Sequence, residues 1–107
     1  MNADYQAPIF TQLSMEQGLS QTIVECIMQD STGFMWFGTQ DGLNKFDGIN
    51  FTVIKQVPGK TNSLSYNHIT ALLESRKGVF WIGTFNGGLN KFLPKSNRYF
   101  HFLILFF

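Results

Sequence analysis

The feature that most constrains the fold of this 107-residue chain is an internal repeat. Trp36 and Trp81 lie 45 positions apart (81 − 36), and the same offset aligns Ser20 with Ser65, Gly33 with Gly78, Gly38 with Gly83 and Thr39 with Thr84. After one inserted glycine, the segment Gly-Leu-Asn-Lys-Phe recurs unchanged at 42–46 and 88–92. A period of this length indicates two copies of one supersecondary unit, each covering the hydrophobic face of its neighbour.

Each copy has the pattern of four short strands. In the first strand of copy one, Val24, Cys26 and Met28 form an apolar face with period two, and Ile69, Ala71 and Leu73 do so in copy two. The second strand of each copy is apolar on both faces, so both faces must be covered. The predicted strands are 23–29, 35–39, 43–46 and 51–54, then 68–74, 80–84, 89–92 and 99–102.

The turns between these strands decide the fold class. A hairpin turn is predicted between the first and second strands of each copy, because an Asp or Ser opens the segment and a Gly closes it. These segments are Asp30-Ser-Thr-Gly33 and Ser75-Arg-Lys-Gly78. Such turns every 8–12 residues exclude a helical repeat, which needs apolar residues three and four apart over long runs. Four antiparallel strands per copy, covered on both faces, predict an all-β fold: two four-stranded antiparallel blades of an incomplete β-propeller.

The segment Phe10-Thr-Gln-Leu13 is similar to Phe51-Thr-Val-Ile54, which predicts an outer strand before the first blade. The expected division is therefore an N-terminal extension at 1–9, an outer strand and the loop after it at 10–19, repeat one at 20–64, repeat two at 65–102, and an apolar tail at 103–107 that we interpret as a truncation.

Composition narrows the range of possible functions. A net charge of +1 provides no basic field for nucleic acid. The single cysteine, Cys26, excludes an internal disulfide and a cysteine pair for metal, so we expect no metal and no cofactor. The sequence shows neither a signal peptide nor an apolar run of the roughly 20 residues needed to span a bilayer.

One segment of the chain closely resembles the two-component regulator propeller repeat. It is residues 30–48, Asp-Ser-Thr-Gly-Phe-Met-Trp-Phe-Gly-Thr-Gln-Asp-Gly-Leu-Asn-Lys-Phe-Asp-Gly. Copy two departs from that pattern at Ser75, where Asp is usual, and at the extra Gly88. The resemblance implies a non-catalytic, periplasmic ligand-sensing propeller of a membrane-anchored hybrid histidine kinase or diguanylate cyclase receptor. It also implies as partners a glycan or other small polar ligand, the remaining blades, and a second copy of the parent receptor in a homodimer.

In a propeller, one rim carries the loops that lead into the inner strands and those that join second and third strands. We therefore predict a ligand-binding rim for a hydroxyl-rich ligand, made of Gln40, Asp41, Tyr66, Asn67, Phe85 and Asn86. His68, at the start of an inner strand, is a further candidate, although a structural role is favoured for it.

Other prominent residues are expected to be structural. Both tryptophans are predicted to pack between blades rather than to stack on sugars, and the complete structural set is Gly33, Trp36, Gly38, Gly78, Trp81 and Gly83. Asp30, Asp41 and Asp47 are interpreted as turn formers, so no catalytic residue is assigned.

Two other functions are also compatible with the sequence: the start of a propeller enzyme acting on glycans, and a protein-interaction propeller. We also expect the isolated chain to be poorly autonomous, because two blades leave two apolar sheet faces bare.

Overall fold

The computed structural model describes residues 18–20 and 23–103. The predicted extension at 1–9, the outer strand at 10–13 and most of the apolar tail lie outside these residues. The strands are β1 Val24–Gln29, β2 Met35–Thr39, β3 Gly42–Phe46, β4 Phe51–Ile54, β5 Ile69–Glu74, β6 Phe80–Thr84, β7 Leu89–Leu93 and β8 Arg98–Phe102.

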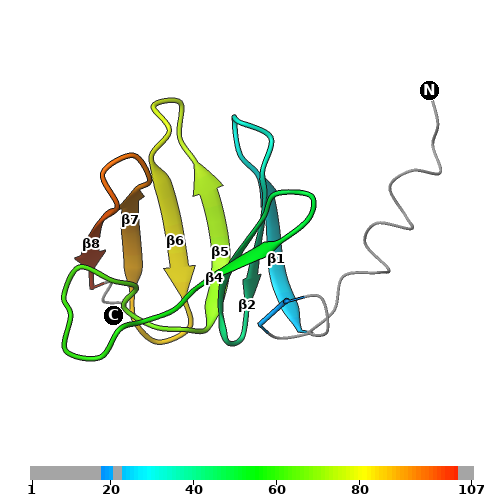
Figure 1. Cartoon of the computed structure of the whole chain (residues 1–107). Helices are drawn as coiled ribbons and strands as arrows, with labels where there is room; N and C mark the ends of the chain where they lie inside the picture. The colour runs from blue at the N-terminus through cyan, green and yellow to red at the C-terminus, as the bar shows by residue number, and fades with distance from the viewer. Residues whose placement is uncertain (1–17, 21–22, 104–107) are drawn as a thin grey trace, which may run out of the picture.

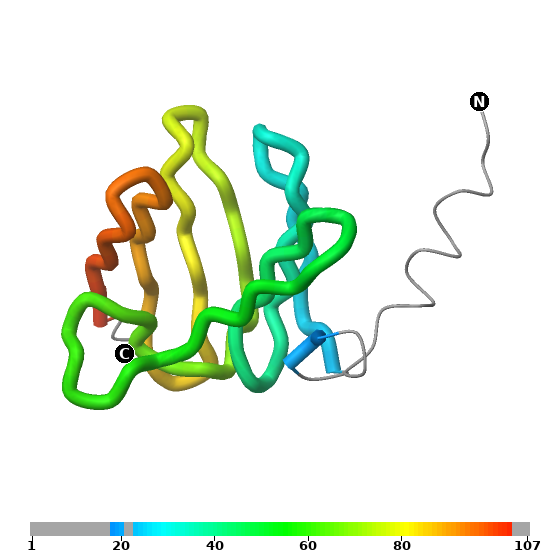
Figure 2. The backbone as a smooth tube through the Cα atoms, in the orientation of Figure 1, coloured from blue at the N-terminus to red at the C-terminus, as the bar shows by residue number. Residues whose placement is uncertain are grey.

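The strands form two four-stranded antiparallel sheets, ordered β1-β2-β3-β4 and β5-β6-β7-β8. We call them blade 1 and blade 2. They stand side by side, and the connection at 55–68 runs from the outer strand of blade 1 to β5 of blade 2 (Figures 1 and 2). The predicted all-β fold is confirmed, with strand bounds within one residue of those expected. No helix occurs in the described part of the chain, which therefore has none that could cross a membrane.

One local feature was not predicted. The pairing register shifts at the start of both inner strands, between Val24 and Cys26 and between Ile69 and Ala71. The strict alternation expected there is interrupted, so Ile69 is fully buried while Ala71 is exposed. Because the irregularity occurs at the same place in both blades, it belongs to the repeat itself.

The core lies between the two blades. Trp36 of β2 meets Phe80 of β6 edge to face, with ring centroids 4.9 Å apart. The buried cluster is made of Trp36, Leu43, Leu64, Ile69, Phe80, Ile82 and Phe92. Gly38 allows this close approach, because a Cβ there would lie 2.4 Å from Cys26 Sγ and 2.7 Å from Ile69 Cγ2.

The two tryptophans differ in their surroundings. Trp36 is 3% exposed, whereas Trp81 is only partly buried on the face of blade 2 that points away from blade 1. Leu73 on that face is 63% exposed. The expected inter-blade position therefore holds for Trp36 alone, since no described sheet covers Trp81.

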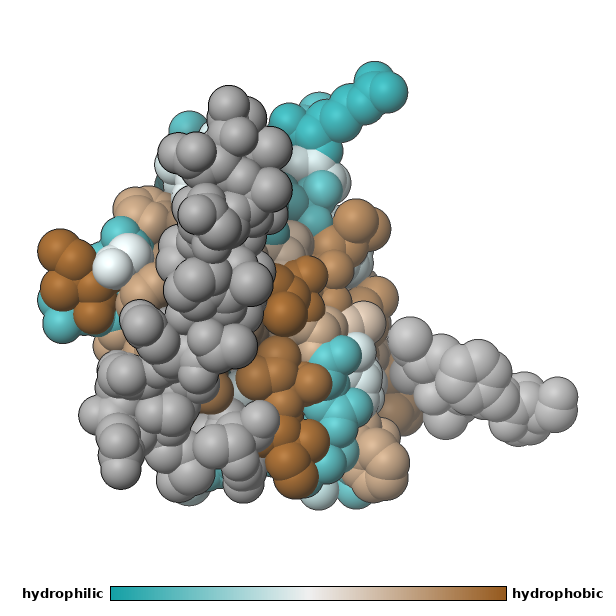
Figure 3. Space-filling view, turned by 90° about the vertical axis from the view of Figure 1, so that its right-hand side faces the viewer, coloured by the Kyte–Doolittle hydropathy of each residue, from teal (hydrophilic) through white to brown (hydrophobic). Residues whose placement is uncertain are grey.

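Blade 1 also presents apolar surface on its own far side. Figure 3 views this side and shows hydrophobic residues gathered on it. Ile23 and Ile27 are each about half exposed. Each blade therefore has one covered face and one apolar face directed away from its neighbour.

Candidate functional site at one rim of the blades

Backbone hydrogen bonds join the loops of the predicted rim. Gly42 N, after the β2–β3 turn, donates to Asn67 O at 2.7 Å. Phe85 N, in the β6–β7 turn, donates to His68 O at 2.9 Å. The predicted rim residues, which come from three separate segments, therefore lie in one continuous strip across both blades.

A threonine at the end of the second strand shapes each of these turns. Thr39 Oγ1 donates to Gly42 O at 2.9 Å and accepts from Asp41 N at 3.0 Å. Thr84 Oγ1 donates to Gly88 O at 2.8 Å and accepts from Gly87 N at 2.8 Å. The same geometry holds both turns despite the inserted glycine, because the threonine satisfies the local backbone groups in each case.

A fully buried asparagine fixes the loop that leads into each inner strand. Asn44 Oδ1 accepts from Ser20 N at 2.9 Å, and Asn44 Nδ2 donates to Ser20 Oγ at 2.8 Å. Asn90 makes the same pair with Ser65, at 3.0 Å and 2.7 Å. These hydrogen bonds hold β3 or β7 to the loop before the inner strand and so position the rim. The alignment of Ser20 with Ser65 and of Asn44 with Asn90 is the corresponding signal in the sequence.

The rim side chains divide into two groups. Asp41 forms an ion pair with Lys55 at 2.8 Å, and Asn67 Oδ1 accepts from Gln56 N at 2.7 Å, so both hold neighbouring loop atoms. Gln40, Phe85 and Asn86 are exposed and Tyr66 is half-buried, which leaves amide and aromatic groups facing solvent.

Glu25 lies at the centre of this strip and was not among the predicted site residues. Its Oε2 accepts from Gln40 Nε2 at 3.1 Å and lies 3.4 Å from His68 Nε2. The Gln40 hydrogen bond, with the nearby His68, lowers the pKa of the Glu25 carboxyl against a smaller opposing effect of burial. The contact with His68 is an approach rather than a hydrogen bond, since Nε2 has no hydrogen-bond partner within the described residues.

His68 connects Glu25 to an exposed aromatic ring. The rings of His68 and Phe85 stack with centroids 5.0 Å apart and planes 15° from parallel. Phe85 is 69% exposed, so one ring face remains open. The sequence gives one signal for this contact: His68 aligns with Ile23 at the start of the adjacent inner strand, two residues before Glu25.

This arrangement suits recognition rather than reaction. An open ring face, two amides and a carboxylate can bind a ligand rich in hydroxyl groups. No group of three metal-ligating side chains occurs among residues 18–20 and 23–103.

The remaining predicted structural residues support the turns at the opposite rim. Gly33 and Gly78 have φ of 99° and 74°, and each donates its N–H to the residue that opens its turn, Asp30 or Ser75, at 3.0 Å. Only Asp30 also uses its side chain, because Ser75 lacks a carboxylate. Asp47 accepts from Ile49 N and Asn50 N, as expected of a turn former.

Repeated four-stranded sheets that use one another as hydrophobic cover define a β-propeller. Residues 18–41 and 63–86 each match the family model described as two component regulator propeller. Each blade thus contains one match to the two-component regulator propeller repeat, and this region is a propeller rather than a catalytic module.

Known proteins similar to the chain include a histidine kinase and the extracellular domain of a two component system. A histidine kinase of Formosa agariphila is 45% identical over 57 residues, which are 53% of this chain and 4% of the relative. A solved structure, described as the extracellular domain of a hybrid two component system from B. thetaiotaomicron, is 35% identical with a TM-score of 0.76. That match covers 84% of this chain and 13% of the solved one, so the chain spans a small part of each relative.

Proposed function

We propose that these two blades form part of a periplasmic sensing propeller in a membrane-anchored two-component receptor. The observation that supports this most strongly is the match of 84% of the chain to the extracellular domain of a hybrid two component system. The similarity to a histidine kinase supports the same class of output module. Periplasmic location, kinase output and ligand sensing are all parts of this proposal.

Within that function, the rim is the proposed ligand site. Gln40, Tyr66, Phe85 and Asn86 supply the solvent-facing groups, while Asp41 and Asn67 hold the loops that carry them. The polar groups lie beside an open aromatic ring, which is the combination that binds the faces and hydroxyls of a sugar.

A panel of neutral oligosaccharides, titrated against the chain by calorimetry, tests the ligand assignment. We expect at least one to bind, and Phe85→Ala and Asn86→Ala to weaken that binding about fivefold or more, because each removes one exposed contact worth about 1 kcal/mol. Asn50→Ala in the opposite rim is the control and should leave the affinity unchanged. Binding that tolerates both rim variants would refute the site.

The location is tested separately in the complete receptor. A reagent that cannot cross the inner membrane should modify lysines of these blades in intact cells with a permeabilised outer membrane. Modification only after lysis would contradict a periplasmic propeller.

A further inference from the structure

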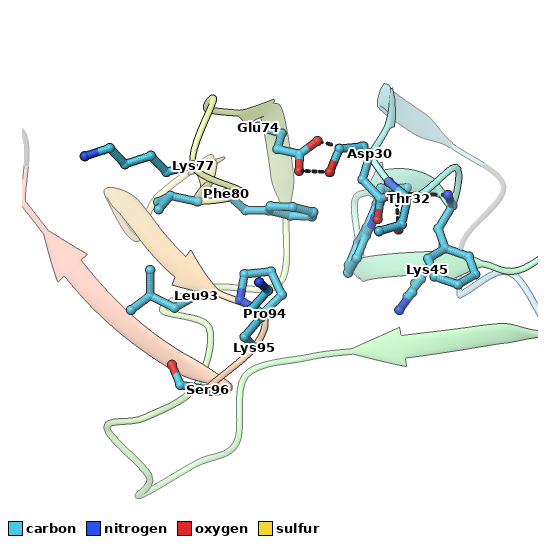
Figure 4. Close-up of a pocket in the computed structure, with 15 residues that line it drawn as sticks. Asp30, Thr32, Lys45, Glu74, Lys77, Phe80, Leu93, Pro94, Lys95 and Ser96 are labelled. Atoms are coloured by element: carbon cyan, nitrogen blue, oxygen red, sulfur yellow. Dashed lines mark hydrogen bonds between the residues drawn. The ribbon is translucent and has the colours of Figure 1, made fainter.

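We propose that the cleft between the two blades, at the rim opposite the one described above, binds a flat organic anion such as an aromatic carboxylate. This inference goes beyond the sensing function and does not rest on it. The cleft has a volume of about 720 Å³, in the size range of small-molecule sites. Its walls come from the β1–β2 turn, the β5–β6 turn and the β7–β8 turn (Figure 4).

The two carboxylates of the cleft, Asp30 and Glu74, already accept hydrogen bonds from other groups of the protein. Asp30 Oδ1 accepts from Thr32 N at 2.9 Å, and Oδ2 accepts from Trp36 Nε1 at 2.8 Å. The two oxygens of Glu74 accept from Ser31 N at 2.8 Å and from Ser31 Oγ at 2.9 Å, which ties the two blades together across the cleft. Each carboxylate oxygen therefore has a donor within the protein, and neither group needs a ligand.

Two basic groups of the cleft, by contrast, have no ion-pair partner among the described residues. Lys45 of blade 1 and Lys95 of blade 2 both line the cleft, from opposite sides (Figure 4). Neither has a carboxylate within 4 Å among the described residues. Lys77 also lines the cleft, but its side chain extends away from the other labelled residues. The lining carries three ammonium groups against the two carboxylates of Asp30 and Glu74, so its net charge is +1, and the two lysines without an ion-pair partner favour an anion.

The remaining surface favours a flat, apolar body on that anion. Four residues line the cleft with apolar atoms: Phe34, Val79 and Leu93, which are partly buried, and Pro94, which is exposed. The Lys45 ammonium lies 4.2 Å from the centroid of the Phe34 ring, so the charge sits directly above an aromatic face. An aromatic carboxylate can place its ring against this wall and its charge at the ammonium groups.

Lysine acetylation with and without 2-naphthoate tests the site in the whole chain. We expect 2-naphthoate to slow the acetylation of Lys45 and Lys95 at least threefold, as measured by mass spectrometry. The acetylation rates of Lys60 and Lys91 should stay unchanged. Lys91 is a matched control, because it is the repeat equivalent of Lys45 on the open face of blade 2. The neutral analogue 2-naphthalenemethanol should give no protection. Equal protection of Lys91, or protection by the neutral analogue, would overturn the proposal.

Substitution separates charge from apolar binding. By 2-naphthoate fluorescence, Lys45→Gln and Lys95→Gln should each weaken binding about fivefold, the loss expected for one partly exposed charge contact. Lys91→Gln should retain the affinity of the unmodified chain. Lys95 is exposed in a turn, so its variant reports on the site even if Lys45→Gln perturbs folding. Unchanged affinity in Lys95→Gln contradicts the assignment.

Discussion

At the scale of single residues, Asp30 shows how a turn former becomes a structural centre. Its carboxylate accepts from the backbone of Thr32 and Phe34, from the Thr32 hydroxyl, and from the indole of Trp36. Burial alone would raise the pKa of Asp30, but the hydrogen bonds from Trp36, Thr32 and Phe34 together lower it below its usual range. The residue thus connects the β1–β2 turn to the inter-blade core.

We predict that Asp30→Ala lowers the free energy of unfolding at pH 7 by about 1–2 kcal/mol, because it removes several hydrogen bonds to a charged acceptor in a partly solvated site. Since the folded-state pKa is depressed, this stability is present above the unfolded pKa of about 3.9 and is lost as the pH falls through the folded value. Urea unfolding at pH 7 and pH 2.5 measures both effects.

The matched control for this prediction is Asp41→Ala, which removes an exposed ion pair with Lys55 and should cost at most about 0.5 kcal/mol. An Asp30→Ala difference that is as large at pH 2.5 as at pH 7 would contradict the role assigned to the carboxylate.

At the scale of elements, the buried asparagines hold strands to loops. Asn90, in β7, has no solvent exposure and bonds both the backbone and the hydroxyl of Ser65. We predict that Asn90→Ala costs about 2–3 kcal/mol, since it removes two hydrogen bonds and leaves a partly buried N–H without its partner. Chemical denaturation followed by tryptophan fluorescence measures the loss.

Asn86→Ala is the control within the same hairpin, because Asn86 is exposed and should change stability by less than about 0.5 kcal/mol. Equal effects of the two substitutions would show that the hydrogen bonds between Asn90 and Ser65 do not stabilise the blade.

The strands were predictable because their signals are local. Period-two apolar residues and Gly-closed turns placed all eight described strands, and aligned pairs such as Trp36 and Trp81 indicated stacked repeats. The register shift before Cys26 and the approach of Glu25 to His68 were not predictable, because they depend on how neighbouring strands and blades meet. The cleft was missed for the same reason: its walls come from turns far apart in the sequence.

At the scale of the whole molecule, equivalent residues of the two blades report on the interface. A Cβ at Gly38 would lie 2.4 Å from Cys26 Sγ of its own blade and 2.7 Å from Ile69 Cγ2 of the other blade, whereas the three atoms nearest to one at Gly83 all belong to its own blade, Ala71 Cβ first at 3.2 Å. We predict that Gly38→Ala costs about 1–3 kcal/mol more than Gly83→Ala, because overpacking forces the blades apart. Unfolding of both variants in urea measures the difference, and equal costs would contradict the observed stacking.

The open face of blade 2 should drive association of the isolated chain. Leu73 and Phe102 are 63% and 45% exposed there, close to the partly buried Trp81. We predict that the chain sediments as a mixture of associated species, and that Leu73→Lys shifts it toward the monomer. Ile49→Lys is the control, since Ile49 is 83% exposed in the β3–β4 turn, outside the sheet face. A compact monomer with a sharp thermal transition would contradict this expectation.

The two sheets share one core, and a double-mutant cycle between Trp36 and Phe80 tests this most directly. The rings meet edge to face across the blades, so we predict a coupling free energy of about 0.5–1.5 kcal/mol beyond the separate losses. The same cycle between Trp81 and Phe80, which do not meet across the interface, should give a smaller value. Additive losses for Trp36→Leu and Phe80→Leu would show that the blades do not stack in this way.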